Sequence, residues 1–428
     1  MANPITGTPC RKWHQCAAML LVFAAQTQYA LADTAQEFAE ADSKLAAAWH
    51  DQNLEEALPW ARKRVEIMAA QDRSSPQLLT PLLHLAMVEL QLGKSAAALE
   101  TIEHAESILG KQGGDMMRLE FLMLKAQVFA DRDDDAEAYD IYARAVRVNK
   151  RLKPYDLSRE AMIFDAYLEV AKQYQRKRKG DFAADRGLAA REKLYGEDSI
   201  ELIAGLEIYA RWCNFSSQLG DEREVRKRII RILEVHRGLR DPQIAEQAIL
   251  IAKGYLHDKI EDNDAAQLME QALAVDFPNT KEVYLLQIEA LATSGDIQMV
   301  FGSGEEGINY YRQAWKLLAE NPDFGPDEAN HYFRRASRIY HNWPDRPARL
   351  KRGLAHFADG KVEVEFDVLA NGHLGSFKIV KSTVSNLDRA AFHRLADKAR
   401  YRPRLVNGEP VITTGLKTAK LYETQRRN

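Results

Sequence analysis

Cysteine is scarce in this sequence, with three residues in a chain of 428. Cys10 and Cys16 lie in a segment that we expect to be removed by cleavage after Ala32, which leaves Cys213 alone and excludes an internal disulfide. A lone cysteine can be a nucleophile, but it needs a base and an electropositive cleft. We expect Cys213 to be a small packing residue instead.

Motifs for catalysis and cofactor binding are also missing. No HExxH, P-loop, GxSxG or paired CxxC sequence occurs, and the eleven histidines are scattered rather than grouped at the spacing of metal ligands. Acidic pairs and runs are present, but in a helical chain they are typical of solvated turns and helix starts. We therefore expect a non-enzymatic protein without a metal site or a cofactor.

The apolar run near the start of the chain is too short for a typical membrane span. It covers residues 17–25, about half of the ~20 residues that a spanning helix needs. Arg11 and Lys12 precede it, and the small-residue pattern Ala30-Leu31-Ala32 follows, which is the layout of a secretory signal. Residues 1–32 are thus predicted to be a cleaved signal peptide. Without cleavage, the segment would remain as a membrane anchor.

The net charge is small but unevenly distributed. The whole chain has a formal charge of -3, yet residues 345–428 contain 17 Lys or Arg and only nine Asp or Glu. This excess of eight positive charges implies that the preceding residues carry -11. A basic module of this kind favours an acidic peptide, an anionic membrane surface or the acidic body of the same chain.

What the sequence does contain is an internal repeat. From Asp33 to about Tyr340 the pattern is almost continuously helical, and a small residue recurs with a partner four positions later and another three beyond that. Successive starts lie 41, 40, 45, 42, 40 and 42 residues apart. The copies are Ala57/Ala61, Ala98/Ile102/Ala105, Ala138/Tyr142/Ala145, Ala183/Gly187/Ala190, Val225/Ile229/Ile232, Ala265/Met269/Ala272 and Gly307/Tyr311/Ala314.

A second small residue lies twelve positions before several of these starts. Two antiparallel helices cross closely only where side chains are small, so each repeat needs one such contact on each helix. These residues are Ala86, Ala126, Ala171 and Cys213.

The spacing and the choice of residues resemble tetratricopeptide repeats. Leu85-Ala86 occupies the place of that family's Leu-Gly pair, Gly93 begins the turn, and Ala98 and Ala105 match its two small positions in the second helix. HEAT-type repeats have a similar spacing and remain the alternative. Either kind of array stacks helix pairs into a solenoid whose concave face commonly holds a peptide or a partner domain. A capping helix is predicted from Asp327 through Tyr340.

The pattern changes from helical to strand-like at Gly360. Residues 362–368 alternate between apolar and acidic side chains, as expected of a strand with one buried face. The Asn371-Gly372 pair predicts a tight turn into a second strand through Ile379. A helix is predicted from Ser385 to Leu395, and a third strand from Val411 to Tyr422. The predicted order is strand, strand, helix, strand.

This tail resembles the TonB C-terminal domain family. The matching features, in order, are Gly360-Lys361-Val362, Asn371-Gly372, Leu387-Asp388-Arg389-Ala390-Ala391, Tyr401-x-Pro403 and Gly408-x-Pro410-Val411. The sequence departs from the family at Ala399, where members commonly have tryptophan. The resemblance implies a small sheet crossed by one helix, with an exposed edge on the last strand.

In TonB-like proteins that last strand region contacts a short segment of an outer-membrane transporter by strand addition. The resemblance therefore implies a protein or extended peptide partner, possible because an edge strand has unpaired N–H and C=O groups. On this basis the edge residues expected to bind a partner are Val411, Thr413, Gly415 and Lys417. Arg402 and Arg404 are expected to attract an acidic partner. The alternative is that this edge is covered or forms a dimer.

Together these features predict three segments: a signal peptide over 1–32, a helical repeat array over 33–342, and a small α+β TonB-like domain over 343–428. We expect a periplasmic interaction or adaptor protein of the cell envelope that does not bind nucleic acid. The alternative is a TonB-type energy transducer, anchored in the inner membrane by an uncleaved N-terminal segment and supporting transport through outer-membrane receptors.

Overall fold

The computed structural model describes residues 32–112, 114–258, 263–277, 280–340, 360–383 and 396–422. The predicted signal peptide and the predicted helix from Ser385 to Leu395 lie outside these residues. Contacts divide the chain into two compact units, Met1–Asp156 and Leu157–Asn428. The domain boundaries expected from the sequence stay a prediction.

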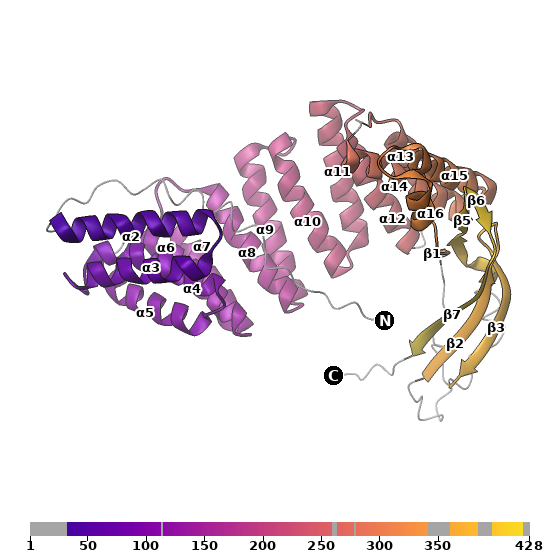
Figure 1. Ribbon diagram of the computed structural model, residues 1–428. Helices are drawn as coiled ribbons and strands as arrows, with labels where there is room; N and C mark the ends of the chain where they lie inside the picture. Colours follow the sequence, from indigo (N-terminus) through magenta and orange to yellow (C-terminus); the bar gives the residue numbers. More distant parts are fainter. Residues whose placement is uncertain are drawn as a thin grey trace, which may run out of the picture. The chain divides into compact units, whose positions relative to one another are not determined.

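The first unit is built from helices that pack in consecutive pairs (Figure 1). A short 3-10 helix, η2 (Pro76–Leu78), leads into the second pair. The α-helices described in this unit are α2 (Ala32–His50), α3 (Leu54–Ala69), α4 (Leu79–Gln91), α5 (Ser95–Gln112), α6 (Asp115–Asp131) and α7 (Asp135–Asn149).

The second unit continues with helix pairs and ends in the tail. A 3-10 helix, η3 (Ile200–Leu202), precedes α10. The α-helices described in this unit are α8 (Leu157–Gln173), α9 (Lys177–Tyr195), α10 (Ile203–Ser216), α11 (Leu219–Arg237), α12 (Pro242–Asp258), α13 (Asn263–Leu273), α14 (Lys281–Phe301), α15 (Gly304–Glu320) and α16 (Gly325–Tyr332).

The small residues of the repeat lie at the contacts between paired helices, as predicted. Ala98, Ile102 and Ala105 of α5 are completely buried, and so are Ala86 of α4 and Cys213 of α10. Small side chains at these positions let the helix backbones approach closely. The helical repeat array predicted from the spacing is therefore confirmed.

Helices α14 and α15 have a glycine on each side of their contact. A Cβ added to Gly295 of α14 would lie 2.9 Å from the carbonyl oxygen of Gly307, and one added to Gly307 of α15 would lie 2.9 Å from that of Gly295. Both positions therefore need glycine. This contact fixes α14 against α15, the two helices on which the tail packs.

The predicted capping helix is shorter than expected. Helix α16 ends at Tyr332, and residues 337–340 form strand β1 instead of a further helical turn. Strand β1 pairs with β4, some sixty residues away in sequence. The helical prediction was wrong here because it considered only local pattern, whereas pairing with a distant strand satisfies this backbone.

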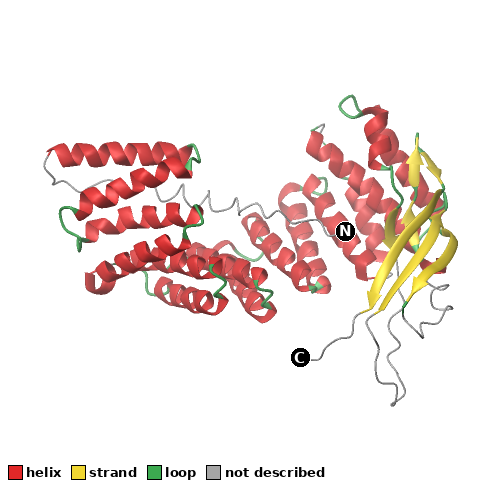
Figure 2. Ribbon diagram, turned by 60° about the horizontal axis from the view of Figure 1, so that its bottom comes forward, coloured by secondary structure: helices red, strands yellow, loops and turns green. Residues whose placement is uncertain are grey.

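The strands gather beside the last helices of the second unit (Figure 2). They form antiparallel sheets with the orders β1-β4, β3-β2-β7 and β5-β6. Their bounds are β1 (Ser337–Tyr340), β2 (Gly360–Val368), β3 (Leu374–Ser382), β4 (Arg400–Arg402), β5 (Arg404–Val406), β6 (Glu409–Val411) and β7 (Thr413–Tyr422).

The three-stranded sheet has one dry face, as the alternation of side chains predicted. Four side chains of the central strand β2 are buried on this face: Val362, Val364, Phe366 and Val368. Ala399 and Tyr401 pack against them from the β4 segment. The small residue at Ala399 is thus part of the core of the tail, at the place where the family commonly has tryptophan.

Candidate functional site

Strand β7 forms one edge of the three-stranded sheet. Its neighbour is the central strand β2, and β3 lies on the far side of β2 (Figure 1). Among the residues that the structure describes, β7 pairs with no second strand. An edge of this kind presents N–H and C=O groups that an extended peptide can complete.

A bulge interrupts β7 near its start. Asp367 of β2 faces two residues of β7, Thr414 and Gly415, instead of one. Gly415 has a φ of +67°, and its N–H donates to Oδ1 of Asp367 at 2.9 Å. A left-handed backbone at a bulge suits glycine, which has no Cβ to clash. Gly415 therefore shapes the edge strand through its backbone.

Glu365 connects the two edge strands on the polar face of the sheet. It lies directly opposite Lys378 of β3 and Lys417 of β7. The Nζ atoms of these lysines lie 2.7 and 3.4 Å from its carboxylate oxygens. The hydrogen bond from Lys378, with a further one from Lys417, lowers the pKa of Glu365. The Lys417 side chain is still 69% exposed, so it remains accessible to a partner.

The β5-β6 hairpin has a tight two-residue turn. Arg404 and Val411 face each other across it, and Asn407 and Gly408 form its tip. Their φ values of +51° and +81° are those of a two-residue turn that needs left-handed backbone at both positions. The Asn-Gly pair therefore fixes the register of the hairpin.

This hairpin packs on the last helices of the array. Leu405 is buried among residues of α14, α15 and α16, and its N–H donates to the carbonyl oxygen of Phe333 at 3.1 Å. At the tip, the N–H of Asn407 donates to Oδ1 of Asn330 at 2.9 Å. Apolar burial and paired backbone groups thus hold β5 and β6 against the body.

Arg402 of β4 forms the central ion pair of this junction. Its Nε and Nη2 atoms donate to the two carboxylate oxygens of Asp296 on α14, at 3.1 and 2.7 Å. The side chains are only 16% and 14% exposed. Burial by itself lowers the pKa of Arg402, but the facing carboxylate outweighs it and raises that pKa above its ordinary value. Bidentate geometry at such a buried position is the strong form of this interaction.

Tyr311 of α15 completes the pair. Its hydroxyl donates to Oδ1 of Asp296 at 2.7 Å, and its ring lies beneath the guanidinium of Arg402. Burial, with the nearby Asp296 carboxylate, raises the pKa of Tyr311 well above its ordinary value. Tyr311 therefore remains a neutral donor to the carboxylate, so the three groups satisfy one another.

The turn between β2 and β3 adds a second contact with α14. The N–H of Tyr401 donates to the carbonyl oxygen of Gly372 at 2.9 Å. Gly372 has a φ of +76°, and a Cβ there would overlap the Met299 side chain and the Tyr401 carbonyl oxygen. The predicted Asn-Gly turn is present, and its glycine also allows the tail to approach the helix closely.

The residues predicted to bind a partner fall into three places. Those on the open edge strand are Thr413, Gly415 and Lys417; those on the docked hairpin are Arg404 and Val411. Arg402 is in the junction, where its acidic partner is Asp296 of the same chain. This ion pair matches the expectation that a basic tail favours the acidic body. Binding of an external partner by the predicted residues stays a prediction.

Sequence reasoning did not find the body side of the junction. Asp296 and Tyr311 are ordinary residues of a helical pattern, and nothing near them in sequence indicates the tail. One signal was present, because a glycine such as Gly295 inside a helix often marks a close backbone approach. It indicates the helix crossing, however, and not the neighbouring ion pair.

The described residues contain little that suggests chemistry. They include no group of three or more His, Cys, Asp or Glu side chains that could hold a metal ion. Cys213 is buried, and burial raises the pKa of its thiol to about 12, which fits the packing role expected for it. No helix in the described ranges is long and apolar enough to cross a membrane.

The described fold is thus a helical repeat array that ends in small antiparallel sheets. Residues 355–419 match the family model described as Gram-negative bacterial TonB protein C-terminal. The tail is therefore a domain of this type, as its motifs indicated, and the helical repeats precede it. No curated protein matches the chain in sequence.

Several solved structures of helical repeat proteins are similar to the chain at low sequence identity. The C-terminal part of a TPR repeat-containing protein from Cytophaga hutchinsonii has 16% identity and a TM-score of 0.44, over 67% of this chain and 97% of that chain. The apo form of RapI has 16% identity and a TM-score of 0.44, over 70% and 79%. Since both TM-scores are below 0.5, the repeat architecture rests on the helix pairs described above.

Proposed function

We propose that this protein is a non-enzymatic adaptor whose tail binds an extended segment of another protein along the edge of β7. The observation that carries the proposal is the position of β7, which has β2 on one side and no strand on the other among the described residues. An added peptide strand would pair with its backbone, and alternate side chains would select the sequence.

The docked side of the tail supports this assignment. The β4-β6 segment is held on the array by Arg402, Leu405 and Asn407, so it presents less free surface than β7. The hydrogen bond from the N–H of Tyr401 to the carbonyl oxygen of Gly372 connects this segment to the sheet of β7, and an edge strand that is already formed lowers the ordering cost of binding. The repeat array would carry the tail and bind a second partner.

We place this function in the periplasm. The proposal rests on the signal-like pattern of residues 1–32 and on the match of the tail to a family of Gram-negative bacterial proteins. The partner at β7 would then be an envelope component, such as an outer-membrane transporter.

The same tail motif makes energy transduction the second candidate. A transducer needs residues 1–32 to remain as an inner-membrane anchor. The N-terminus of the protein in the cell separates the two functions: a chain that begins at Asp33 excludes the anchored transducer, and an intact Met1 in the membrane fraction excludes the soluble periplasmic adaptor.

Crosslinking from the two edges of the sheet tests the β7 proposal. A photoreactive amino acid replaces Lys417 in one variant and Lys378 in the other. The two lysines are matched, because both lie opposite Glu365 and their side chains are 69% and 65% exposed. We expect Lys417 to capture an envelope protein that Lys378 does not.

The captured segment then provides a second readout. A synthetic peptide of that segment should compete with capture at Lys417 in the purified full chain. Equal capture at Lys378, or no capture at Lys417 in cells that carry the protein's natural partners, would contradict binding along β7.

A further inference from the structure

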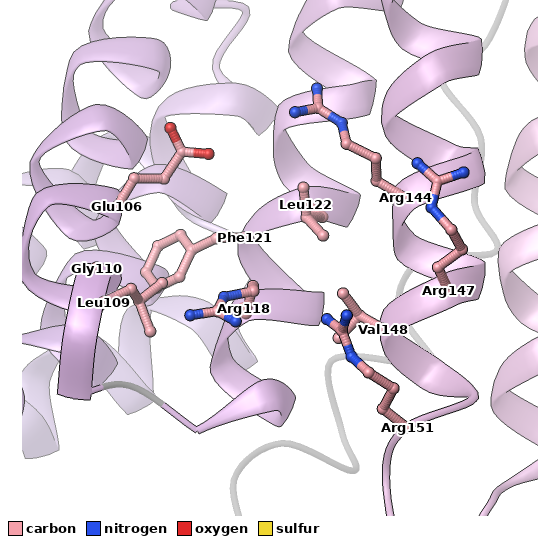
Figure 3. A pocket seen from close by; sticks show the side chains of 10 residues that line it. All are labelled: Glu106, Leu109, Gly110, Arg118, Phe121, Leu122, Arg144, Arg147, Val148 and Arg151. Carbon is pink, nitrogen blue, oxygen red and sulfur yellow. The ribbon is translucent and has the colours of Figure 1, made fainter.

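A hollow in the first unit is lined by four arginines (Figure 3). Its volume is about 430 Å³, within the range of roughly 300–1,000 Å³ typical of ligand sites. It lies between α5, the first half of α6 and the end of α7, entirely within Met1–Asp156. It is therefore a different site from the edge of β7.

The arginines are placed there by helical spacing. Arg144 and Arg147 of α7 and Arg151 just beyond it are three and four residues apart, so they follow one face of the helix. Figure 3 shows them one after another along this helix, with Arg118 of α6 across from them. A span of seven residues along a helix is about 10 Å, which spreads the positive charge in a line.

Carboxylates of the unit neutralise only part of this charge. Asp115 lies 3.3 Å from Nη1 of Arg118 and 3.7 Å from Nη2 of Arg151, so both arginines share one carboxylate. Glu137 lies 3.2 Å from Arg144. Four guanidinium groups thus meet two carboxylates, which leaves two positive charges in excess.

The guanidinium N–H groups of Arg147 are available to a ligand. In the part of the chain that the structure describes, it has no ion pair or hydrogen bond within the chain, and its side chain is exposed. Glu106, the acidic residue in the lining, does not neutralise it, because its carboxylate accepts from Lys125 at 2.6 Å. An exposed guanidinium group without a partner favours binding to a carboxylate or a phosphate, because its planar N–H donors match their oxygens.

The floor of the hollow is apolar. It is formed by Leu109, Phe121, Leu122 and Val148. Gly110 lies at its rim on α5, and a Cβ added there would meet no atom within 4 Å. A larger side chain at this lining position would therefore extend into open space at the hollow, and glycine is retained in a helix although it is unfavourable by about 1 kcal/mol relative to alanine.

We propose that this hollow binds an acidic peptide segment, with carboxylates on the arginines and one apolar side chain on the floor. A single phosphate could not reach all the arginines along 10 Å of helix, about the span of three extended residues. It would also leave the apolar floor uncovered. An acidic peptide that carries an apolar residue matches both the line of charge and the floor.

Fluorescence anisotropy on the purified full chain tests this site. The probe is a labelled peptide of sequence DELED, compared with NQLQN, which lacks the charges, and DESED, which lacks the apolar side chain. We expect the affinity to be highest for DELED, lower for DESED and lowest for NQLQN. Binding should weaken as the salt concentration rises, because the contacts are exposed charges.

Two variants and a matched control locate the binding. Arg147→Glu should weaken DELED binding by about tenfold, since it reverses one charge without removing an ion pair of the folded chain. Gly110→Phe should abolish binding by filling the hollow. Lys150→Glu makes the same charge change next to α7 but outside the lining, and should alter binding by less than about twofold.

Circular dichroism establishes that the variants fold, and Arg147→Glu carries the test if Gly110→Phe does not. Three results would overturn the proposal: no binding of DELED, an equal loss in Lys150→Glu, or full displacement of DELED by inorganic phosphate with DESED bound as tightly. The first unit and the tail are tested separately, so failure here leaves the β7 proposal standing.

Discussion

Arg402 and Lys417 are both basic residues of the tail, and they lie in opposite environments. Arg402 is 16% exposed and makes two hydrogen bonds to Asp296 on α14, whereas Lys417 is 69% exposed and contacts Glu365 within its own sheet. The first pair is shielded from water, and the second is screened by it. The tail therefore has a docked side, β4 to β6, and an open side, β7.

Positive charge in the tail therefore serves two purposes. On the docked side it holds the domain on the array, and there the acidic partner is part of the chain. On the open side it is left at the surface, beside backbone groups that a partner strand can use. A substitution on one side should therefore leave the other side unaffected.

The largest effect is expected from breaking the junction ion pair. Asp296→Ala leaves the guanidinium of Arg402 without its carboxylate in a largely buried place, which costs about 3 to 5 kcal/mol. The cost should appear as a lower melting temperature of the second unit. Arg404→Ala, which removes a basic side chain that is exposed on the hairpin, is the control and should change stability by less than about 0.5 kcal/mol.

A double variant distinguishes a lost partner from general damage. Asp296→Leu with Arg402→Met replaces the pair by apolar groups of similar volume, and this should recover much of the lost stability. Equal melting temperatures for Asp296→Ala and the original chain would contradict a docked tail.

A smaller effect is expected from a matched pair of glycines, one on each side. Gly372 and Gly415 have φ values of +76° and +67°, so alanine is strained at both. Only at Gly372 would the new Cβ also meet Met299 and the Tyr401 carbonyl, whereas at Gly415 nothing lies within 4 Å. Chemical denaturation should give a loss of about 2 kcal/mol for Gly372→Ala and about 1 kcal/mol for Gly415→Ala.

The two losses of stability should differ if the turn at Gly372 packs closely against α14. Equal losses would mean that backbone strain is the whole effect, and that the turn at Gly372 does not touch α14.

Local patterns predicted much of this architecture. The spacing of small residues such as Ala98 and Ala105 indicated paired helices, because a close crossing requires small side chains wherever it occurs. Asn371-Gly372 indicated a tight turn, because left-handed backbone restricts the choice of residue. These features depend on neighbours in sequence.

Contacts between distant parts of the chain could not be predicted in the same way. The local pattern of residues 337–340 predicts the end of a helix. In the folded chain these residues form a strand instead, because they pair with β4. Arg402 looks like a free basic residue in the sequence, because Asp296 is 106 positions away and the adjacent Gly295 indicates only the helix crossing. The arginines of the hollow come from α6, α7 and the residues after α7. They lie close together only because these helices pack against each other, which the local pattern does not predict.

Hydrogen exchange of the full chain, resolved to single residues, distinguishes a tail that is docked on one side from one that is free on both. We expect the N–H groups of Tyr401 and Leu405, which donate to the carbonyl oxygens of Gly372 and Phe333, to exchange as slowly as the core of α14. Along β7, the amides that point away from β2 should exchange fast. Rapid exchange at Tyr401 and Leu405, or uniform protection along the whole of β7, would contradict a tail that is docked on one side and open on the other.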